Sequence, residues 1–164
     1  DQALAAVPDD ELLRQRRRRD VLAGGYRLSA HPAAEDDVTL VGVGAIMPEV
    51  CAAATALAGV GVSAGIVCVT SADLLFRSLQ SRGGDGEHSA ILDRILPADA
   101  PAPLVTVHDG HPHTLAFLAG ARGDRIRSLG VTRFGQASSV TDAYRIHGID
   151  ADSIAGAALD LLGR

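Results

Sequence analysis

The chain has 164 residues, which suits one domain, and 47% of them are hydrophobic. Its formal charge is −5 and its 15 basic residues are all Arg, a balance that argues against nucleic acid as the main partner. No apolar run approaches the ~18 residues that a membrane span needs, so we expect no membrane partner and a cytoplasmic protein. Because the sequence begins at Asp1 rather than Met, we also expect that it was cut from a longer chain or lost its start.

The first predicted element is a charged helix at Pro8–Asp20, PDDELLRQRRRRD. Acids open this segment and Arg residues close it, which is the order that a helix dipole favours. Few of its residues are apolar, so we predict a solvated linker helix and lead-in over residues 1–20 and a domain over residues 21–164. Phosphate binding by the Arg run is the less favoured alternative. Gly24–Ser29, GGYRLS, then predicts a short strand.

From residue 38 onward, short β-branched runs alternate with helical patterns. The runs are continuously apolar, which predicts strands buried on both faces, and the long connections predict a mostly parallel sheet with helices on both sides. The predicted strands are Val38–Val43, Ala64–Val69, Leu104–Val107 and Arg125–Val131. The predicted helices are Pro48–Leu57, Ala72–Gln80 with an N-cap at Thr70-Ser71, a short one around Ile91–Leu96, and Thr114–Ala121.

The helix Pro48–Leu57, PEVCAAATAL, is apolar on nearly all sides. Such a helix is usually buried on more than the side that faces the sheet, so we expect another domain or a second copy to cover it. The alternative is that Ala, a weak hydrophobe, is tolerated at the surface. Cys51 and Cys68 each lie in an apolar stretch, and we expect two small buried thiols rather than a disulfide or a catalytic Cys.

Two glycines, Gly42 and Gly44, follow a predicted strand and precede a predicted helix, as the glycines of a dinucleotide site do. Met47 occupies the third glycine position of that motif. The end of the next strand, Val69–Ser71, carries no acid for a ribose hydroxyl. We therefore favour a tight strand-to-helix turn over a nucleotide site.

The loop HDGHPH, His108–His113, contains three His and one Asp in six residues. Imidazole and carboxylate are common zinc ligands, but no further ligand cluster stands out in the sequence. We favour a polar loop whose His and Asp bond to each other, to backbone or to a partner. It follows a predicted strand, and ligands gather at the carboxyl ends of such strands, so this loop is the best functional candidate.

The tail predicts two helices that brace the sheet. Ser139 and Asp142 resemble a capping box, and Gly148 suits a C-cap, which bounds a helix at Val140–His147. A second helix follows. Its predicted cap is Asp150, its predicted staple is Ile149 with Ile154, and its apolar stripe is Ile154, Ala158, Leu161 and Leu162.

Five blocks follow one another along the chain: VLAGGYRLS, VTLVGVGAIMPEVCAAATAL, GIVCVTSADLLFRSLQ, VTVHDGHPHTLAFLAG and LGVTRFGQASSVTDAYRIHGIDADSIAGAAL. Together they resemble the C-terminal domain of transketolase-like enzymes, and most closely the homodimeric decarboxylating component of pyruvate dehydrogenase. The most specific piece is the corner Phe134-Gly135-Gln136 with the tail after it. Members commonly continue this corner with Ser-Gly, where this chain has Ala-Ser.

The resemblance implies a three-layer α/β/α sandwich. Its five-stranded mixed sheet has the order 1-3-2-4-5, with strand 1, here Gly24–Ser29, antiparallel. Strands 2 and 4 are neighbours in that order. The Gly42–Ala45 turn is therefore expected beside the His108–His113 loop, at a topological switch point.

Full-length members bind thiamine diphosphate and Mg²⁺ between two other domains, from two subunits. The resemblance therefore implies upstream thiamine-binding domains or a thiamine-binding subunit as partners, and a homodimer. It places no catalytic, cofactor-binding or metal residue on this chain, which we expect to be inactive alone. Gly84-Asp85-Gly86 resembles the start of a thiamine diphosphate motif, but it follows a Gly-rich loop and the chain has no Asn to end the motif. We interpret that match as accidental.

The leading interpretation is a non-catalytic C-terminal domain or subunit that supports dimer and subunit assembly in such an enzyme. One alternative is a free-standing nucleotide- or small-molecule-binding module that uses the Gly42–Gly44 turn and the His108–His113 loop. Another is a zinc-dependent hydrolase at that loop. Pyruvate, other 2-oxo acids and ketose phosphates are all compatible substrates of the whole enzyme. The interface or switch-point candidates are Gly44, Asp109, His111, His113, Phe134, Gly135 and Gln136.

Overall fold

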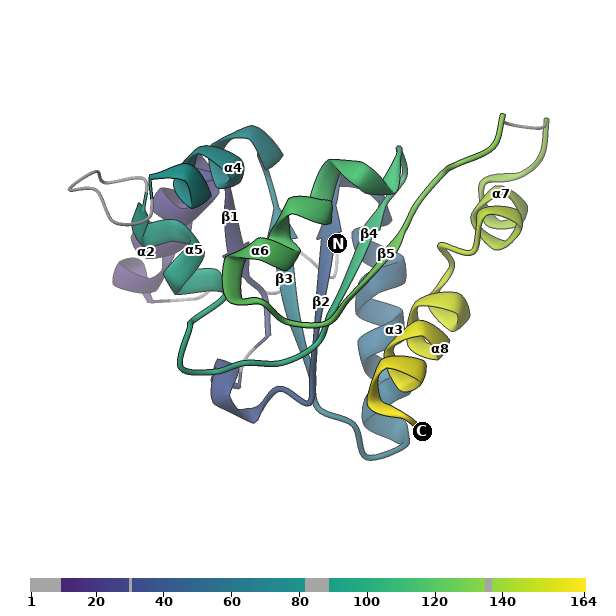
Figure 1. Ribbon diagram of the computed structural model, residues 1–164, viewed down its shortest axis with the longest axis horizontal. Helices are drawn as coiled ribbons and strands as arrows, with labels where there is room; N and C mark the ends of the chain where they lie inside the picture. The colour runs from purple at the N-terminus through teal and green to yellow at the C-terminus, as the bar shows by residue number, and fades with distance from the viewer. Residues whose placement is uncertain (1–9, 30, 82–88, 135–136) are drawn as a thin grey trace.

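The computed structural model describes residues 10–29, 31–81, 89–134 and 137–164. Its five-stranded sheet has the order β1-β3-β2-β4-β5 (Figure 1). β1 runs antiparallel to β3, and the other pairs are parallel, so the predicted order and directions are confirmed. The strands are β1 Gly25–Arg27, β2 Val38–Val43, β3 Ala64–Val69, β4 Leu104–His108 and β5 Ile126–Leu129.

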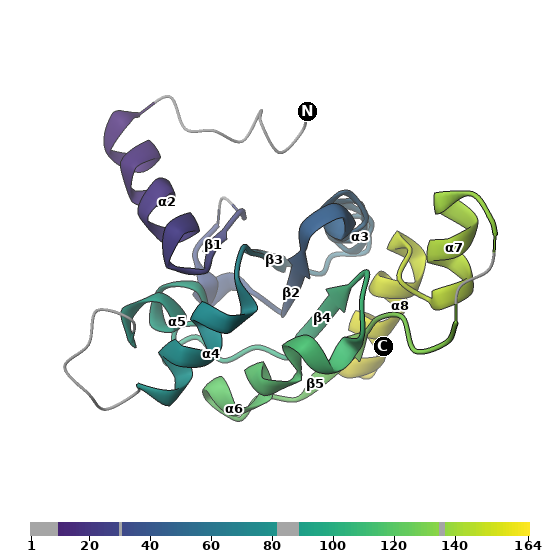
Figure 2. The same cartoon turned by 90° about the horizontal axis from the view of Figure 1, so that it is seen from above.

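Helices cover both faces of the sheet and give the domain three layers (Figure 2). On one face lie α3 (Met47–Gly59) and α8 (Ala151–Leu162). On the other lie α4 (Ala72–Gln80), α5 (Ser89–Ile95), the 3₁₀ helix η3 (Pro112–Leu118) and α6 (Ala119–Arg122). The remaining helices are α2 (Glu11–Ala23), η1 (Ala33–Glu35), η2 (Gly44–Ile46) and α7 (Val140–His147). None of the helices in the described ranges is long and apolar enough to cross a membrane.

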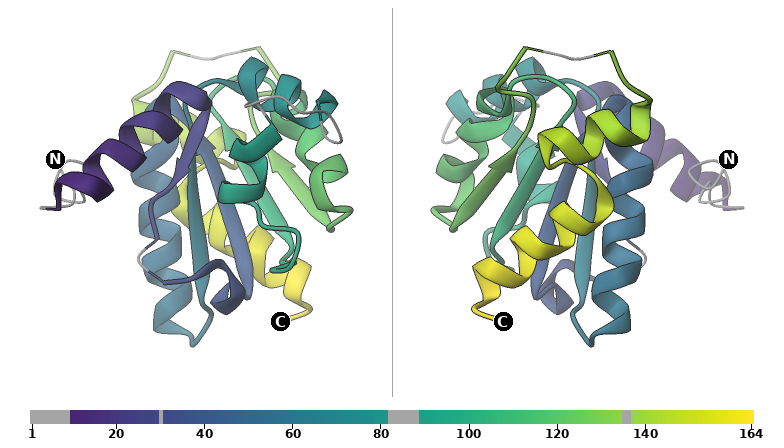
Figure 3. Two further views of the ribbon diagram at one scale, coloured as in Figure 1. Left: turned by 90° about the vertical axis from the view of Figure 1, so that its left-hand side faces the viewer. Right: turned by 90° about the vertical axis from the view of Figure 1, so that its right-hand side faces the viewer.

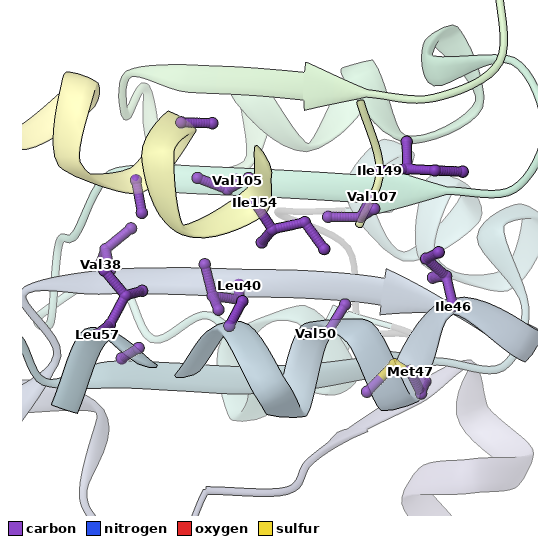
Figure 4. Packing of buried hydrophobic residues seen from close by; sticks show 14 of the residues in the cluster. Val38, Leu40, Ile46, Met47, Val50, Leu57, Val105, Val107, Ile149 and Ile154 are labelled. Atoms are coloured by element: carbon purple, nitrogen blue, oxygen red, sulfur yellow. The ribbon is translucent and has the colours of Figure 1, made fainter. Parts of the chain in front are cut away.

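Two hydrophobic clusters fill the spaces between the layers. In the first, side chains of β2 and β4 meet those of α3 and α8, and Ile154 lies between α8 and the sheet (Figure 4). Ile149 is buried in the same cluster, as the predicted staple requires. In the second, Val41 and Val67 meet side chains of α4, α5 and η3. Because β2 contributes to both clusters, it is buried on both faces, as its continuous apolar run predicts.

Several helix ends lie at the residues that local sequence signals predict. The Ser71 hydroxyl accepts the Leu74 N–H, and the Ser139 hydroxyl accepts the Asp142 N–H at 3.1 Å. Gly148 ends α7 in the left-handed conformation at φ 64°. The bounds predicted for α4 and α7 are therefore those observed.

The segment predicted as a helix at Thr114–Ala121 differs from the prediction. It forms the 3₁₀ helix η3 from Pro112 onward, and only its end is α-helical. Its two buried residues, Leu115 and Leu118, are three positions apart. Side chains at this spacing lie one above the other in a 3₁₀ helix, so the tighter winding turns both toward the sheet.

β5 is shorter than the predicted strand Arg125–Val131. The Val131 N–H donates to the Gly110 carbonyl at 2.8 Å and so leaves the ladder for the loop after β4. At Gly130 an added Cβ would lie 2.6 Å from the same carbonyl. The close approach of the two loops therefore ends the strand at Leu129.

The start of α8 corrects one prediction. Asp150 occupies the N-cap position, but its side chain caps no backbone N–H of the helix. Glu49 of α3 takes that role, because its Oε2 accepts the Ala151 N–H at 2.8 Å. The cap comes from a helix about 100 residues earlier, a pairing that local sequence rules do not detect. Leu161, expected in the core, is half-buried at the edge of the first cluster.

α3 is buried only on the sides that face the sheet and α8. Met47, Val50, Ala53 and Leu57 are buried, whereas Ala52, Ala56 and Ala58 are exposed. The exposed stripe is therefore made of small side chains, and its covering by a second copy or another domain stays a prediction. Cys51 and Cys68 are half-buried rather than fully buried.

The amino ends of the parallel strands are joined by a buried carboxylate. The side chain of Asp36, 1% exposed, lies just before β2. Both of its oxygens accept from Nη2 of Arg27 at 2.9 Å, and it also accepts from Thr39 Oγ1 and contacts His31 Nε2. At Gly65 an added Cβ would lie 1.9 Å from this carboxylate. Arg27 of β1, Thr39 of β2 and Gly65 of β3 thus all pack against the Asp36 carboxylate.

A buried guanidinium, that of Arg122, likewise joins the chain segments that lead into β4 and β5. Arg122, after η3, pairs with Asp124 just before β5. Its two terminal nitrogens donate to the carbonyls of Pro97, Ala100 and Ala102, at 2.7–3.3 Å, in the segment that leads into β4. The pair therefore fixes the entry into β4 and β5.

Candidate functional site

The candidate site lies at the carboxyl ends of β2 and β4, at the top of Figure 1. The two strands are paired in parallel, with Val43 opposite His108. The chain leaves β2 through Gly44 and leaves β4 through Asp109, so the two loops start side by side. This is the juxtaposition that the strand order predicts, and it forms the switch point of the sheet.

The His108–His113 loop satisfies several of its own polar groups. Asp109 Oδ1 lies 3.0 Å from His108 Nδ1, an ion-pair distance without hydrogen-bond geometry. The His111 ring accepts the His113 N–H at 3.3 Å and caps η3, and the two rings meet edge to face with centroids 6.4 Å apart. Asp109, His111 and His113 are exposed, whereas His108 is half-buried against Gly110.

His108 belongs to the loop selected from the sequence, but it was not among the individual interface or switch-point candidates. Its Nδ1 is buried and makes no hydrogen bond within the described residues. In the same part of the chain, no three His, Cys, Asp or Glu side chains gather as metal ligands would. The zinc alternative therefore gains no support from this loop.

The glycines after β2 are explained by packing and backbone geometry. An added Cβ at Gly42 would lie 2.7 Å from Met47 Sδ and 2.8 Å from Val50 Cγ2, so this glycine lets α3 approach the strand. Gly44 has φ 68° and open space around it, which suits the tight turn into η2. Neither glycine needs a bound phosphate to account for it, which weakens the nucleotide alternative.

The corner after β5 exposes large apolar side chains. Phe134 is 100% exposed, and Val140 and Ile146 of α7 are 67% and 47% exposed. Gly135 and Gln136, which complete the corner motif, lie outside the described residues, as does Gly84-Asp85-Gly86. Figures 1 and 3 show α7 standing away from the sheet at this end of the molecule. The corner and α7 therefore expose three large apolar side chains, Phe134, Val140 and Ile146.

The two thiols lie on α3 and β3, with Cys68 opposite Gly42 of β2. Burial raises the pKa of the Cys51 thiol, and the nearby Cys68 adds to the effect. Burial likewise raises the pKa of the Cys68 thiol. Both groups are therefore held protonated at neutral pH, which makes them weak nucleophiles.

Comparison with known proteins identifies the family. The model of the transketolase-like TK C-terminal domain matches residues 24–150, and the chain belongs to this family. The resemblance to the C-terminal domain of transketolase-like enzymes is thereby confirmed. No curated protein matches the sequence.

Solved transketolases share the fold. The enzyme from Campylobacter jejuni superposes with a TM-score of 0.60 at 16% identity, over 84% of this chain and 18% of that one. The enzyme from Pichia stipitis, in complex with sedoheptulose 7-phosphate, gives 0.65 at 17% identity, over 88% and 19%. A split-gene transketolase, described as an inactive β4 tetramer, gives 0.56 at 18% identity, over 86% and 43%. The chain thus spans about a fifth of the length of the first two.

Proposed function

We propose that this chain is the non-catalytic C-terminal domain or subunit of a thiamine diphosphate-dependent enzyme of the transketolase and pyruvate dehydrogenase kind. In this proposal the thiamine-binding domains lie upstream or on a separate subunit. The chain supports their assembly and the formation of a homodimer, and it binds neither thiamine diphosphate nor Mg²⁺ by itself. The enzyme works in the cytoplasm.

The exposed apolar side chains of Phe134, Val140 and Ile146 carry this proposal. Large exposed apolar side chains that cluster at one end of a domain mark contacts with other proteins. The corner that holds Phe134 is joined to the loop after β4 by the bond from the Val131 N–H to the Gly110 carbonyl, and in that loop the polar groups of Asp109, His111 and His113 can bond to a partner. Apolar anchors beside polar groups are the usual composition of a protein–protein interface.

The size of the chain is consistent with an assembly role. Since it spans 18% of one transketolase and 19% of another, most of the catalytic machinery of such an enzyme would lie elsewhere. The split-gene neighbour shows that a transketolase can be divided between chains and that one kind of chain can associate without activity. We extend both properties to this chain.

A matched pair of variants tests the assembly role. Val140 and Val60 are exposed to nearly the same extent, 67% and 63%, but Val60 follows α3 at the opposite end of the sheet. Val140→Ser should weaken association, measured by sedimentation velocity over a concentration series, by about tenfold or more in dissociation constant. Val60→Ser should leave it unchanged. Equal effects of the two variants, or a wild-type chain that stays monomeric alone and with its thiamine-binding partner, would contradict the proposal.

Calorimetric titration tests the cofactor part independently. The chain should release or absorb no heat of binding with thiamine diphosphate and Mg²⁺. A dissociation constant of about 10 μM or tighter would place a cofactor site on this chain and contradict that part of the proposal.

A further inference from the structure

A second candidate site lies at the β1 edge of the sheet. A cavity of about 490 Å³ opens between α2, β1, η1 and α5. Figure 2 shows α2 beside β1, with α5 next to both and the switch-point edge farther along the sheet. The volume is within the range of small-molecule sites, and the cavity shares no described lining residue with the switch point.

The lining of this cavity is strongly basic. Arg16, Arg17, Arg27, Arg94 and His31 line it, and among the described lining residues Asp20 is the one acid. The whole chain carries a formal charge of −5, so the basic lining is a local feature and not a reflection of overall composition. Such a concave surface raises the local concentration of anions.

Two of the arginines are held in place and still line the cavity. Nε of Arg94 donates to Asp20 Oδ1 at 2.8 Å, and among the described residues no acceptor is bonded to its two terminal nitrogens, which can therefore donate to a ligand. Arg27 is fixed by the buried Asp36, which offsets its charge, and it also donates from Nη2 to Ser29 Oγ at 3.1 Å and from Nη1 to the Ile95 carbonyl at 3.3 Å, so it mainly shapes the cavity wall. Guanidinium groups anchored in this way lose little side-chain entropy when they bind an anion.

The third anchored arginine joins α2 to the sheet. The guanidinium carbon of Arg17 lies 5.5 Å from the centre of the Tyr26 ring, a cation–π contact. Burial, together with a hydrogen bond to Cys68, raises the pKa of Tyr26 to about 12. The phenol is therefore neutral at physiological pH and adds no negative charge to the cavity.

We propose that this cavity binds a small organic phosphate. Planar guanidinium groups match the oxygens of phosphate in pairs, and Arg16, Arg17 and Arg94 around one hollow, beside the paired Arg27, favour this anion over a neutral metabolite. The volume admits a phosphate ester rather than the inorganic ion alone. The Arg run of α2 then contributes to a defined pocket instead of serving only as a solvated helix face. This inference does not rest on the proposed assembly role.

Titration with glycerol 3-phosphate tests the proposal, with glycerol and succinate as controls for the ester and for charge. We expect a dissociation constant of about 1 mM or tighter for the phosphate. Amide signals of α2, β1 and α5 should shift in two-dimensional NMR spectra, and those of His108–His113 should not. Glycerol should not bind, and succinate should bind at least about tenfold more weakly.

Variants that each remove one positive charge distinguish binding in the cavity from nonspecific electrostatic attraction of the anion. Arg16→Gln and Arg94→Gln each remove one lining charge and should weaken binding by about threefold to tenfold. Arg16 is exposed, so its substitution should leave the fold intact even if Arg94→Gln disturbs Asp20. Arg14→Gln removes the same charge from the same helix outside the cavity, where Arg14 pairs with Glu11, and should have no effect.

Several outcomes would overturn this assignment. They are no binding up to about 20 mM phosphate ester, equal weakening by Arg14→Gln and Arg16→Gln, and equal affinity for succinate. A poly-glutamate peptide that binds the cavity where the phosphate ester does not would assign it to an acidic protein segment instead.

Discussion

The two ends of the parallel strands are built differently. At the amino end, Asp36 and Arg122 are buried charges whose partners come from several segments, and their bonds join the entries of the strands. At the carboxyl end, Asp109, His111, His113 and Phe134 are exposed. The side-chain contacts described for the His108–His113 loop stay within it, and a backbone bond from Val131 to Gly110 joins it to the corner after β5.

This difference indicates a division of labour. Buried, fully bonded charges make an edge rigid, and those of Asp36 and Arg122 hold the entries of the strands together. Exposed polar and apolar side chains leave the other edge ready for contact at little cost to stability. We therefore expect substitutions at the amino end to act on folding and those at the carboxyl end to act on association.

The largest effect should follow from Asp36→Ala. The change leaves the half-buried Arg27 without its carboxylate partner, and breaking such a buried pair costs about 3–5 kcal/mol of unfolding free energy. Urea denaturation followed by circular dichroism measures the loss. Asp73→Ala, which breaks an exposed pair with Arg77, is the control and should cost about 0–1 kcal/mol. Equal losses would show that the amino end is not held by its buried charge.

Effects of intermediate size on the free energy of unfolding should follow from substitutions of Glu49 and Asp150, and the two should differ. Because Glu49 accepts the Ala151 N–H, Glu49→Ala should lower the free energy of unfolding by about 1 kcal/mol. Asp150→Ala should cost less, since its carboxylate accepts from Ser153 Oγ and caps no backbone N–H. Thermal unfolding of both variants under identical conditions makes the comparison. A larger loss for Asp150→Ala would restore the cap that the sequence alone suggests.

The pair Glu49 and Asp150 also shows what sequence reasoning could reach. The strands after residue 38, α4 and α7 were predictable, because continuous apolar runs, Ser caps and a C-terminal Gly are local signals. The family resemblance supplied the strand order and the antiparallel β1. Local sequence patterns do not predict contacts between distant segments, such as the Glu49 cap, the buried Asp36 and the Arg122 contacts. Gly65 is required because the Asp36 carboxylate occupies the space that its side chain would need. The sequence shows this glycine, but the reason for it is visible only in the structure.

The candidate site, too, could be predicted from the sequence only in part. That the Gly42–Ala45 turn adjoins the His108–His113 loop followed from strand order alone. The half-buried state of His108, the capping role of His111 and the packing reason for Gly42 depend on side-chain geometry, which a sequence pattern does not specify. The basic cavity escaped detection because its arginines come from α2, β1 and α5, and only the Arg run of α2 is contiguous.

The smallest effect on stability should come from His113→Ala, which completes the comparison between the two ends. The side chain is exposed, and the bond of this residue to His111 is made by its backbone N–H, which alanine retains. We expect a change of less than about 0.5 kcal/mol in unfolding free energy, measured by urea denaturation beside Asp36→Ala. If the switch-point edge serves assembly, the same variant should weaken association in sedimentation velocity while the fold stays intact. A loss of stability comparable to that of Asp36→Ala would mean that the carboxyl end is held as rigidly as the amino end, and the division of labour between the two ends would have to be abandoned.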